Sequence, residues 1–168
     1  MQTLLQVINR MNRFAGIAAG LMTAVIGLVV CYAVVARYVF NQPVGWSEEV
    51  STYLMLWAAF LGAGYTMQLD GHIGVDTVCR KLPLSAQAGL KLAKYLVGII
   101  FLALLAWKGI EDCALSVQLG QVSISELAIP MVIPQLALPV GAILVALQLA
   151  EKLMVQLLGD VTDQERAE

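Results

Sequence analysis

The sequence predicts an all-α integral membrane protein, a single domain of four transmembrane helices over residues 1–168 with both termini in the cytoplasm. Its residues are 60% hydrophobic and only 13% charged, and its mean hydropathy of +0.80 lies above the usual range of water-soluble domains. A helix needs about 20 apolar residues to cross a hydrocarbon core about 30 Å thick, and four apolar stretches meet or approach that length. They cover residues 14–36, 50–69, 91–108 and 127–150.

The first stretch, 14–36, contains no Asp, Glu, Lys, Arg or His. The residues before it, 1–13, place apolar side chains near one helical face, which favours either a short helix in the membrane interface or an extension of the same span. A cleaved signal peptide is the competing interpretation. The apolar run is longer than the about 7 to 15 residues of such a segment, however, and no A-x-A site closes it.

The second stretch, 50–69, is equally free of charged residues, whereas the third is apolar without interruption only over 95–107. Lys91, Lys94 and Lys108 flank that shorter core. Lysine side chains can lie along a helix and lift their ammonium groups to the interface, so we expect residues 91–108 to cross the membrane as well.

The fourth stretch, 127–150, contains Pro130, Pro134 and Pro139. Membrane helices tolerate proline where neighbouring groups satisfy the freed carbonyls, so we expect this span to be kinked or to begin irregularly. The prolines are also compatible with a broken helix at a substrate site, although kinks that serve packing are the commoner outcome.

The distribution of Lys and Arg gives the orientation of the four predicted spans. With a cytoplasmic N-terminus, the cytoplasmic side carries eight basic residues and the outer side carries two. The eight are Arg10, Arg13, Arg80, Lys81, Lys91, Lys94, Lys152 and Arg166, and the two are Arg37 and Lys108. Both termini are therefore predicted to lie in the cytoplasm, together with the connection 70–90.

That cytoplasmic connection contains His72 and Asp76, four residues apart. With no second histidine in the chain and with ligands in a glycine-broken loop, a metal site is not expected there. A structural role is the better hypothesis, either at the inner end of the second span or in contact with a partner subunit. After the third span, Lys108 can pair with Glu111 or Asp112 if the helix continues, and the chain is expected to turn near Gly120.

The outer hairpin between the first two spans reads RYVFNQPVGWSEE, residues 37–49. Residues 42–45 have the composition of a turn, and Ser47 before Glu48 and Glu49 predicts a capped helix start. The two carboxylates are favoured there by the helix dipole. Arg37 lies across the hairpin from them, which predicts a semi-buried ion pair with Glu48 or Glu49; independent snorkelling of Arg37 is the alternative.

Small residues recur at four-residue intervals in the first span, which is typical of helices that approach closely in lipid. Gly16 and Gly20 lie on one such ridge, and the second span has a similar one. The pattern leaves open whether these faces meet each other or a partner protein. The ridges are Ala15, Ala19, Thr23 and Gly27; Gly16, Gly20 and Ala24; Ala58 and Gly62; and Ala59 and Ala63.

The hairpin also resembles a known family. RYVFNQPVGWSEE, followed by GHIGVD and by the proline-punctuated IPMVIPQLALPVG, is similar to the small membrane subunit (Q-type, DctQ-like) of tripartite ATP-independent periplasmic (TRAP) transporters. The resemblance covers essentially the whole chain. The R-Y-x-F-N-x-P-x-x-W-x-E-E arrangement is its specific part, and it adds Asn41, Pro43 and Trp46 to the candidate structural or partner-contact residues.

The resemblance implies a non-catalytic scaffold in a sodium-coupled secondary transport system for organic acids, carboxylates such as C4-dicarboxylates or sialic acid. It implies a large M-type subunit that carries the sodium and substrate sites, a periplasmic substrate-binding protein that delivers the solute, and a bacterial or archaeal inner membrane. No cofactor of its own is expected for this chain.

Other classes of function fit less well. An autonomous four-span efflux transporter is the main alternative, but it would need a membrane carboxylate that the first span lacks. A haem-bearing anchor would need histidines within its helices, and the lone His72 lies outside them. The sequence contains no basic cluster suited to nucleic acid and no arrangement suited to nucleophilic catalysis. Cys31, Cys79 and Cys113 fall at different depths, so no disulfide is expected.

Overall fold

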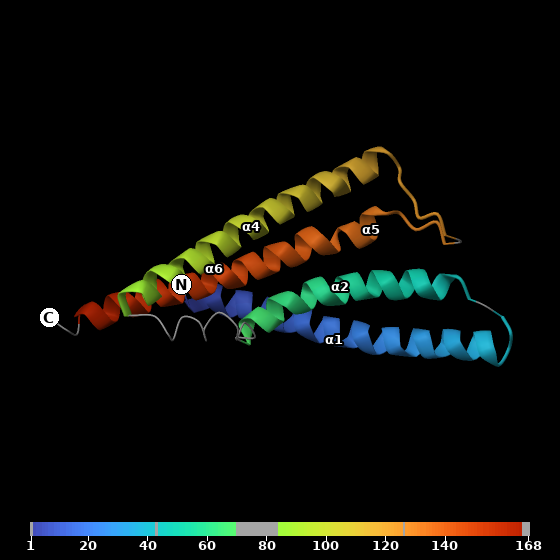
Figure 1. The fold of residues 1–168 in the computed structure, drawn as a ribbon, viewed down its shortest axis with the longest axis horizontal. Coiled ribbons are helices and arrows are strands. Elements are labelled where there is room, and N and C mark those ends of the chain that lie inside the picture. Colours follow the sequence, from blue (N-terminus) through green and yellow to red (C-terminus); the bar gives the residue numbers. More distant parts are fainter. Residues whose placement is uncertain (1, 43, 70–83, 126, 166–168) are drawn as a thin grey trace.

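The computed structural model describes residues 2–42, 44–69, 84–125 and 127–165. Long helices dominate these residues (Figure 1). In chain order they are α1 (Gln2–Tyr38), α2 (Trp46–Gln68), α4 (Leu84–Gln118), α5 (Val132–Gln135) and α6 (Ala137–Glu165).

Helix α1 is continuous over 37 residues. Residues 1–13 could have formed a separate interfacial helix, but from Gln2 onward they extend the first span. No proline interrupts this stretch, and its many aliphatic residues are compatible with an uninterrupted helix.

Helix α4 is likewise longer than the predicted span 91–108, since its 35 residues continue to Gln118. The predicted pair at its outer end is confirmed, because Lys108 Nζ lies 2.7 Å from Glu111 Oε2. Gly120, where a turn was expected, has a φ of 58°, in the left-handed region that glycine adopts without a Cβ clash.

The chain reverses between α4 and α5 through a short hairpin-like connection over residues 119–131. The backbone N–H of Ser123 donates to the carbonyl of Ile129 at 2.8 Å, and that of Met131 donates to Gln121 at 3.0 Å. Val122 and Pro130 form an isolated antiparallel bridge. Residues 127–131, which the sequence assigned to the fourth span, therefore lie outside any helix.

The prolines explain why this region begins irregularly, as expected. Pro134 is the third residue of α5 and Pro139 is the third residue of α6. The first N–H groups of a helix have no intrahelical partner, so proline loses no hydrogen bond at these positions. Only Leu136, which keeps helical backbone angles of −60° and −22°, separates α5 from α6, near the end of the molecule that carries the 119–131 connection (Figure 1).

The helices form a row in the order α1, α2, α6 and α4 (Figure 1). Helix α2 packs against α1 on one side and against α6 on the other, and α6 also packs against α4. Within the described residues the edge helices α1 and α4 do not touch each other. The start of α1 and the end of α6 lie at one end of the row, opposite the 39–45 and 119–131 connections.

Three described helical segments are long and apolar enough to cross a membrane, namely Gln6–Tyr38, Ala93–Gln118 and Val132–Met154. Each of them overlaps one predicted span, namely the first, the third and the fourth, but with different ends. The second predicted span lies in α2, which is not one of these three segments although residues 50–69 contain no charged side chain. The neighbours α1 and α6 cover two sides of this helix.

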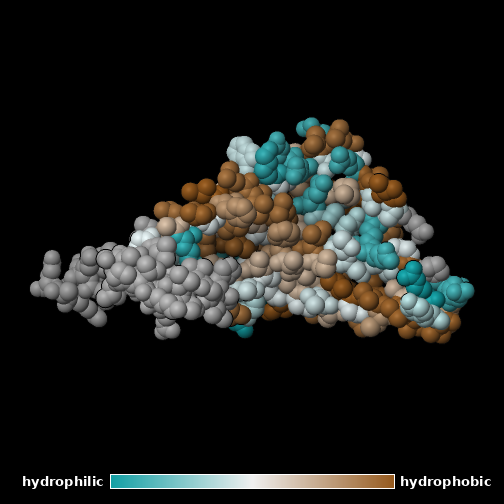
Figure 2. Space-filling model, viewed as in Figure 1, coloured by the Kyte–Doolittle hydropathy of each residue, from teal (hydrophilic) through white to brown (hydrophobic). Residues whose placement is uncertain are grey.

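The surface is apolar between the two ends of the row. Figure 2 shows hydrophobic residues over the middle of the visible face and hydrophilic residues gathered toward the end of α4 and the outer connections. Large apolar side chains are exposed on both edge helices, among them Phe14 at 74% and Trp107 at 73%. Such a surface is suited to hydrocarbon or to an apolar partner.

Candidate functional site

The outer hairpin joins α1 to α2 at one edge of the row. The N–H of Gln42 donates to the carbonyl of Ala36 at 3.0 Å, and Asn41 has a φ of 53°. Asparagine tolerates this left-handed conformation better than most residues. At the start of α2 the ring of Trp46 stacks on Tyr32 of α1, with centroids 6.1 Å apart. Two residues of the motif thus shape the hairpin itself.

The predicted helix cap at Ser47 is wrong. Helix α2 begins at Trp46, the cap position is Gly45, and no side chain caps it. The hydroxyl of Ser47 donates to the carbonyl of Val44 at 2.8 Å, so it ties the first turn back to the hairpin. Glu48 and Glu49 do lie in the first turn, as predicted.

The predicted ion pair of Arg37 is not formed. Among the described residues, no carboxylate lies within 4 Å of its guanidinium. Arg37 and Glu48 instead line the same cavity between the outer ends of α1 and α2, whose volume is about 640 Å³.

Glu49 takes part in a different cluster, which ties α2 to the 119–131 connection. The hydroxyl of Tyr53 donates to Glu49 Oε1 at 2.6 Å, and the hydroxyl of Ser125 donates to Oε2. Hydrogen bonds from Ser123, then from Ser125 and Tyr53, hold the pKa of the Glu49 carboxyl below its ordinary value. Trp57 ties α2 to α5, because its indole N–H donates to the carbonyl of Ile133 at 3.2 Å.

A buried polar cluster joins the start of α1 to α6 at the other end of the row. Asn12 donates to Gln148 Oε1 at 2.6 Å, and Asn9 donates to Glu151 Oε1 at 2.6 Å. Gln148 in turn donates to Glu151 Oε2 at 2.7 Å and to Asn9 Oδ1 at 3.3 Å. Asn12 is fully buried. We call these four residues the amide clasp.

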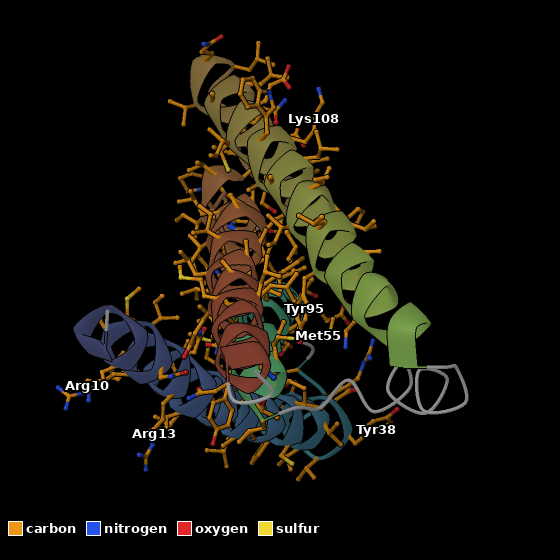
Figure 3. The ribbon with its side chains drawn as sticks, turned by 90° about the vertical axis from the view of Figure 1, so that its left-hand side faces the viewer. Arg10, Arg13, Tyr38, Met55, Tyr95 and Lys108 are labelled. Atoms are coloured by element: carbon orange, nitrogen blue, oxygen red, sulfur yellow. The ribbon has the colours of Figure 1, made fainter. Side chains whose placement is uncertain are left out.

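Sequence reasoning missed the amide clasp. A usable signal was present: Asn9 and Asn12 are three residues apart, and so are Gln148 and Glu151. Each pair therefore occupies one face of its helix. Polar residues at such spacing within apolar helices favour hydrogen bonds between helices. Arg10 and Arg13, which the sequence analysis used to assign the orientation, project from α1 away from α6 (Figure 3).

The small residues of the first span divide between two uses. A Cβ on Gly16 would lie 2.4 Å from Cγ of Tyr65, and one on Gly62 would lie 3.5 Å from Ala19, so these positions let α1 and α2 approach closely. A Cβ on Gly20 or Gly27 would meet no atom within 4 Å. The positions of Gly20 and Gly27 are thus open, whereas Gly16 on the same ridge as Gly20 is packed.

Pro134 and Pro139 are both buried within the row. A Cβ on Gly109 of α4 would lie 2.9 Å from Cδ of Pro139, which shows how closely α4 approaches the start of α6. Pro130 is exposed in the connection before α5. Two of the three prolines therefore serve packing.

Three candidates, Pro43, His72 and Asp76, lie outside the described residues. Within the described ranges, no group of three or more His, Cys, Asp or Glu side chains is placed to hold a metal ion. The described side-chain hydrogen bonds between distant residues join helices to one another and to the 119–131 connection.

The sequence of this chain is similar to those of known membrane transport proteins. The profile of a family described as tripartite ATP-independent periplasmic transporters, DctQ component, matches residues 26–159. A protein of Haemophilus influenzae described as a TRAP transporter small permease protein is 41% identical over 68 residues, which are 40% of this chain and 42% of that relative.

A second relative, from Oleidesulfovibrio alaskensis, is described as the isethionate TRAP transporter permease protein DctMQ. It is 28% identical over 114 residues, which are 66% of this chain but only 17% of the relative. Both alignments thus cover less than half of the relative's own length.

Proposed function

This chain belongs to the DctQ component family of the tripartite ATP-independent periplasmic transporters, and from that membership we propose that it is the small scaffold subunit that holds the large transport subunit in the membrane. The proposed partner is the M-type subunit. The alignment with this chain covers only 17% of the DctMQ relative. The rest of that polypeptide is long enough to contain a much larger subunit fused to the small one.

The placement of ionisable groups carries this proposal. Residues 14–36, 50–69 and 127–150 contain no Asp, Glu, Lys, Arg or His. An autonomous ion-coupled carrier normally needs such a group, or a broken helix, near the middle of the membrane. The junction of α5 and α6 at Leu136 lies near one end of the row, with the long helix α6 after it.

The open faces of the edge helices support a scaffold role as well. Helix α1 exposes Ile17, Leu21 and Leu28, and α4 exposes Val97, Phe101 and Leu104. Because α1 and α4 lie at the two edges of the row, a larger membrane protein can pack on either edge without unfolding this chain.

We further propose four membrane spans, with α2 as the second, both termini in the cytoplasm and the inner membrane as the location. Membership of this family supports sodium coupling and an organic acid as the solute, with a periplasmic protein that delivers this acid to the membrane subunits. The large subunit is the proposed carrier of the sodium and substrate sites.

Reconstituted transport tests the scaffold function. Proteoliposomes receive this chain, the large subunit or both, and are supplied with a sodium gradient and a loaded periplasmic binding protein. Uptake is expected only when both membrane subunits are present. Sodium-dependent uptake by this chain alone would disprove the scaffold role, as would full uptake by the large subunit alone.

A further inference from the structure

The cavity between the outer ends of α1 and α2 has the features of a binding site that neither the fold nor the proposed scaffold role requires. Its volume is about 640 Å³, which is within the range of small-molecule sites. Helix α1 lines it with Val30, Ala33, Val34 and Arg37. Polar residues at the start of α2 line the opposite wall, among them Ser47, Glu48 and Ser51.

Two opposite charges face this cavity without neutralising each other. Arg37 forms no ion pair with a described carboxylate, and the carboxylate of Glu48 accepts no hydrogen bond from any described residue. A guanidinium binds a phosphate through two parallel hydrogen bonds, and a carboxylate accepts them from an ammonium group. Together the two side chains match a ligand that carries both an anion and an ammonium group.

The cavity also contains an unsatisfied hydroxyl. Ser51 Oγ is buried and has no hydrogen-bond partner. Buried polar atoms in native proteins are normally paired, so this hydroxyl is a polar group beside the cavity that a small shift of the side chain would expose to a ligand. A phosphate or ester oxygen of a ligand can accept its proton.

The apolar wall indicates where such a ligand comes from. Val30, Ala33 and Val34 belong to the segment Gln6–Tyr38, which is long and apolar enough to cross a membrane. Arg37 follows them at the end of α1, where its charge lies at the expected edge of the hydrocarbon core. A ligand with a charged head above Arg37 and an apolar body along α1 fits this order of residues.

We propose that this cavity binds a zwitterionic glycerophospholipid with a primary ammonium headgroup, as in phosphatidylethanolamine. Arg37 binds its phosphate, Glu48 accepts a hydrogen bond from its ammonium group, and one acyl chain lies against Val30 and Val34. The lipid then connects the two charges that the hairpin leaves unpaired.

Native mass spectrometry of the full chain, purified and exchanged into mixed micelles, tests this proposal. Equal amounts of phosphatidylethanolamine, phosphatidylcholine and phosphatidylglycerol are supplied, and phosphatidylethanolamine is expected to be retained preferentially. In Arg37→Gln its retention falls about tenfold, as expected for the loss of a charge-assisted hydrogen bond. In Glu48→Gln lipid is still retained, but the preference for phosphatidylethanolamine over phosphatidylglycerol is lost.

Arg13→Gln is the matched control, because it removes an exposed cation at the opposite end of the apolar part of α1. Val34→Trp is the second variant; it fills the apolar wall while both charges remain, and Val34 is exposed enough to accept a larger side chain. Val34→Trp is expected to lower retention and Arg13→Gln to leave it unchanged. Circular dichroism verifies that each variant is helical.

Three results would overturn the proposal. The first is equal retention of phosphatidylethanolamine by the wild type, Arg37→Gln and Val34→Trp. The second is an equal loss in Arg13→Gln, which would indicate a general effect of charge. The third is displacement of the lipid by soluble glycerophosphoethanolamine or inorganic phosphate at similar concentration, which would assign the cavity to a water-soluble phosphate compound instead.

Discussion

Gly16 and Gly20 lie one helical turn apart on α1, yet their surroundings differ. A Cβ on Gly16 would lie within 2.7 Å of three atoms of Tyr65, whereas a Cβ on Gly20 would meet nothing within 4 Å. One glycine permits the contact between α1 and α2, and the other leaves a shallow open face. Small residues on one ridge of a helix can therefore differ in whether they contact a neighbouring helix.

Replacement of each glycine by alanine tests this difference. We expect Gly16→Ala to destabilise the protein by about 1 to 3 kcal/mol, because an overpacked interface has to shift. Gly20→Ala is the control, and we expect it to be neutral or to stabilise by up to about 1 kcal/mol, since alanine favours a helix over glycine. Thermal unfolding in detergent measures both. Equal stability of the two variants would contradict the assigned contact with Tyr65.

Glu49 predicts a pH dependence at the junction of α2 with the 119–131 connection. Hydrogen bonds from Ser123, Ser125 and Tyr53 hold its folded-state pKa below the ordinary value of 4.5. A lowered pKa means that this stabilisation is complete above pH 4.5 and is lost as the pH falls through the folded-state pKa. Unfolding temperatures measured from pH 7 down to pH 3 should therefore decrease less in Glu49→Gln than in the wild type.

A second variant assigns that effect to the cluster. Ser125→Ala removes a donor to Glu49 Oε2 and leaves the carboxylate in place. We expect its pH dependence to lie between those of the wild type and Glu49→Gln. If all three proteins lose stability in parallel on acidification, Glu49 does not contribute to the pH dependence.

At the scale of the elements, the amide clasp fixes where α1 crosses α6. Its four side chains form hydrogen bonds between residues more than 130 positions apart in the chain. The Oδ1 atom of Asn12 has no hydrogen-bond partner and lies against Gly64 of α2, where a Cβ would be 2.4 Å away. Three helices therefore meet at Asn12.

We expect Asn12→Ala to destabilise the protein by about 1 to 3 kcal/mol, more than the about 0.6 kcal/mol average of polar pairs in membrane bundles. The excess arises because Gln148 Oε1 is left buried without a donor. Thr66→Ala is the control, since this exposed residue bonds only within its own helix and should change stability by less than about 0.5 kcal/mol. Chemical unfolding in mixed micelles measures both, and similar values for the two would show that the clasp is not a stabilising contact.

Most of the helices could be predicted from the sequence, because uninterrupted apolar runs determine them. The pairing of helices could not. The sequence places α4 between α2 and α6, but the packing places α6 between α2 and α4. Arg37 and the two glutamates were close enough in sequence to suggest a pair, yet Glu49 bonds instead to Ser125, a partner 76 residues away. Such contacts depend on the three-dimensional order of the helices.

At the scale of the whole molecule, the basic residues whose side chains are described follow the predicted asymmetry. Arg10, Arg13, Lys94 and Lys152 lie toward one end of the row, and Arg37 and Lys108 lie toward the other. The same arrangement puts the start of α1 and the end of α6 at the more basic end. Basic residues favour the cytoplasmic side, so this end is predicted to face the cytoplasm.

Single-cysteine labelling in a background without Cys31, Cys79 and Cys113 tests that orientation. Ile124→Cys, at a fully exposed position of the outer connection, should react with a membrane-impermeant maleimide in intact spheroplasts. Met11→Cys, a half-exposed position near the start of α1, should react only after the membrane is permeabilised. The reverse pattern would invert the topology, and labelling of both positions in intact spheroplasts would contradict the three crossings predicted between them.

The placement of α6 between α2 and α4 has a consequence for biogenesis. Helix α2 has α1 on one side and α6 on the other, and α6 is the last of the four long helices to be synthesised. While the ribosome completes the chain, α2 has α1 beside it but lacks its other neighbour. The nascent protein therefore depends on its last long helix to complete the row, and a chain released before α6 is made leaves one side of α2 without its helical neighbour.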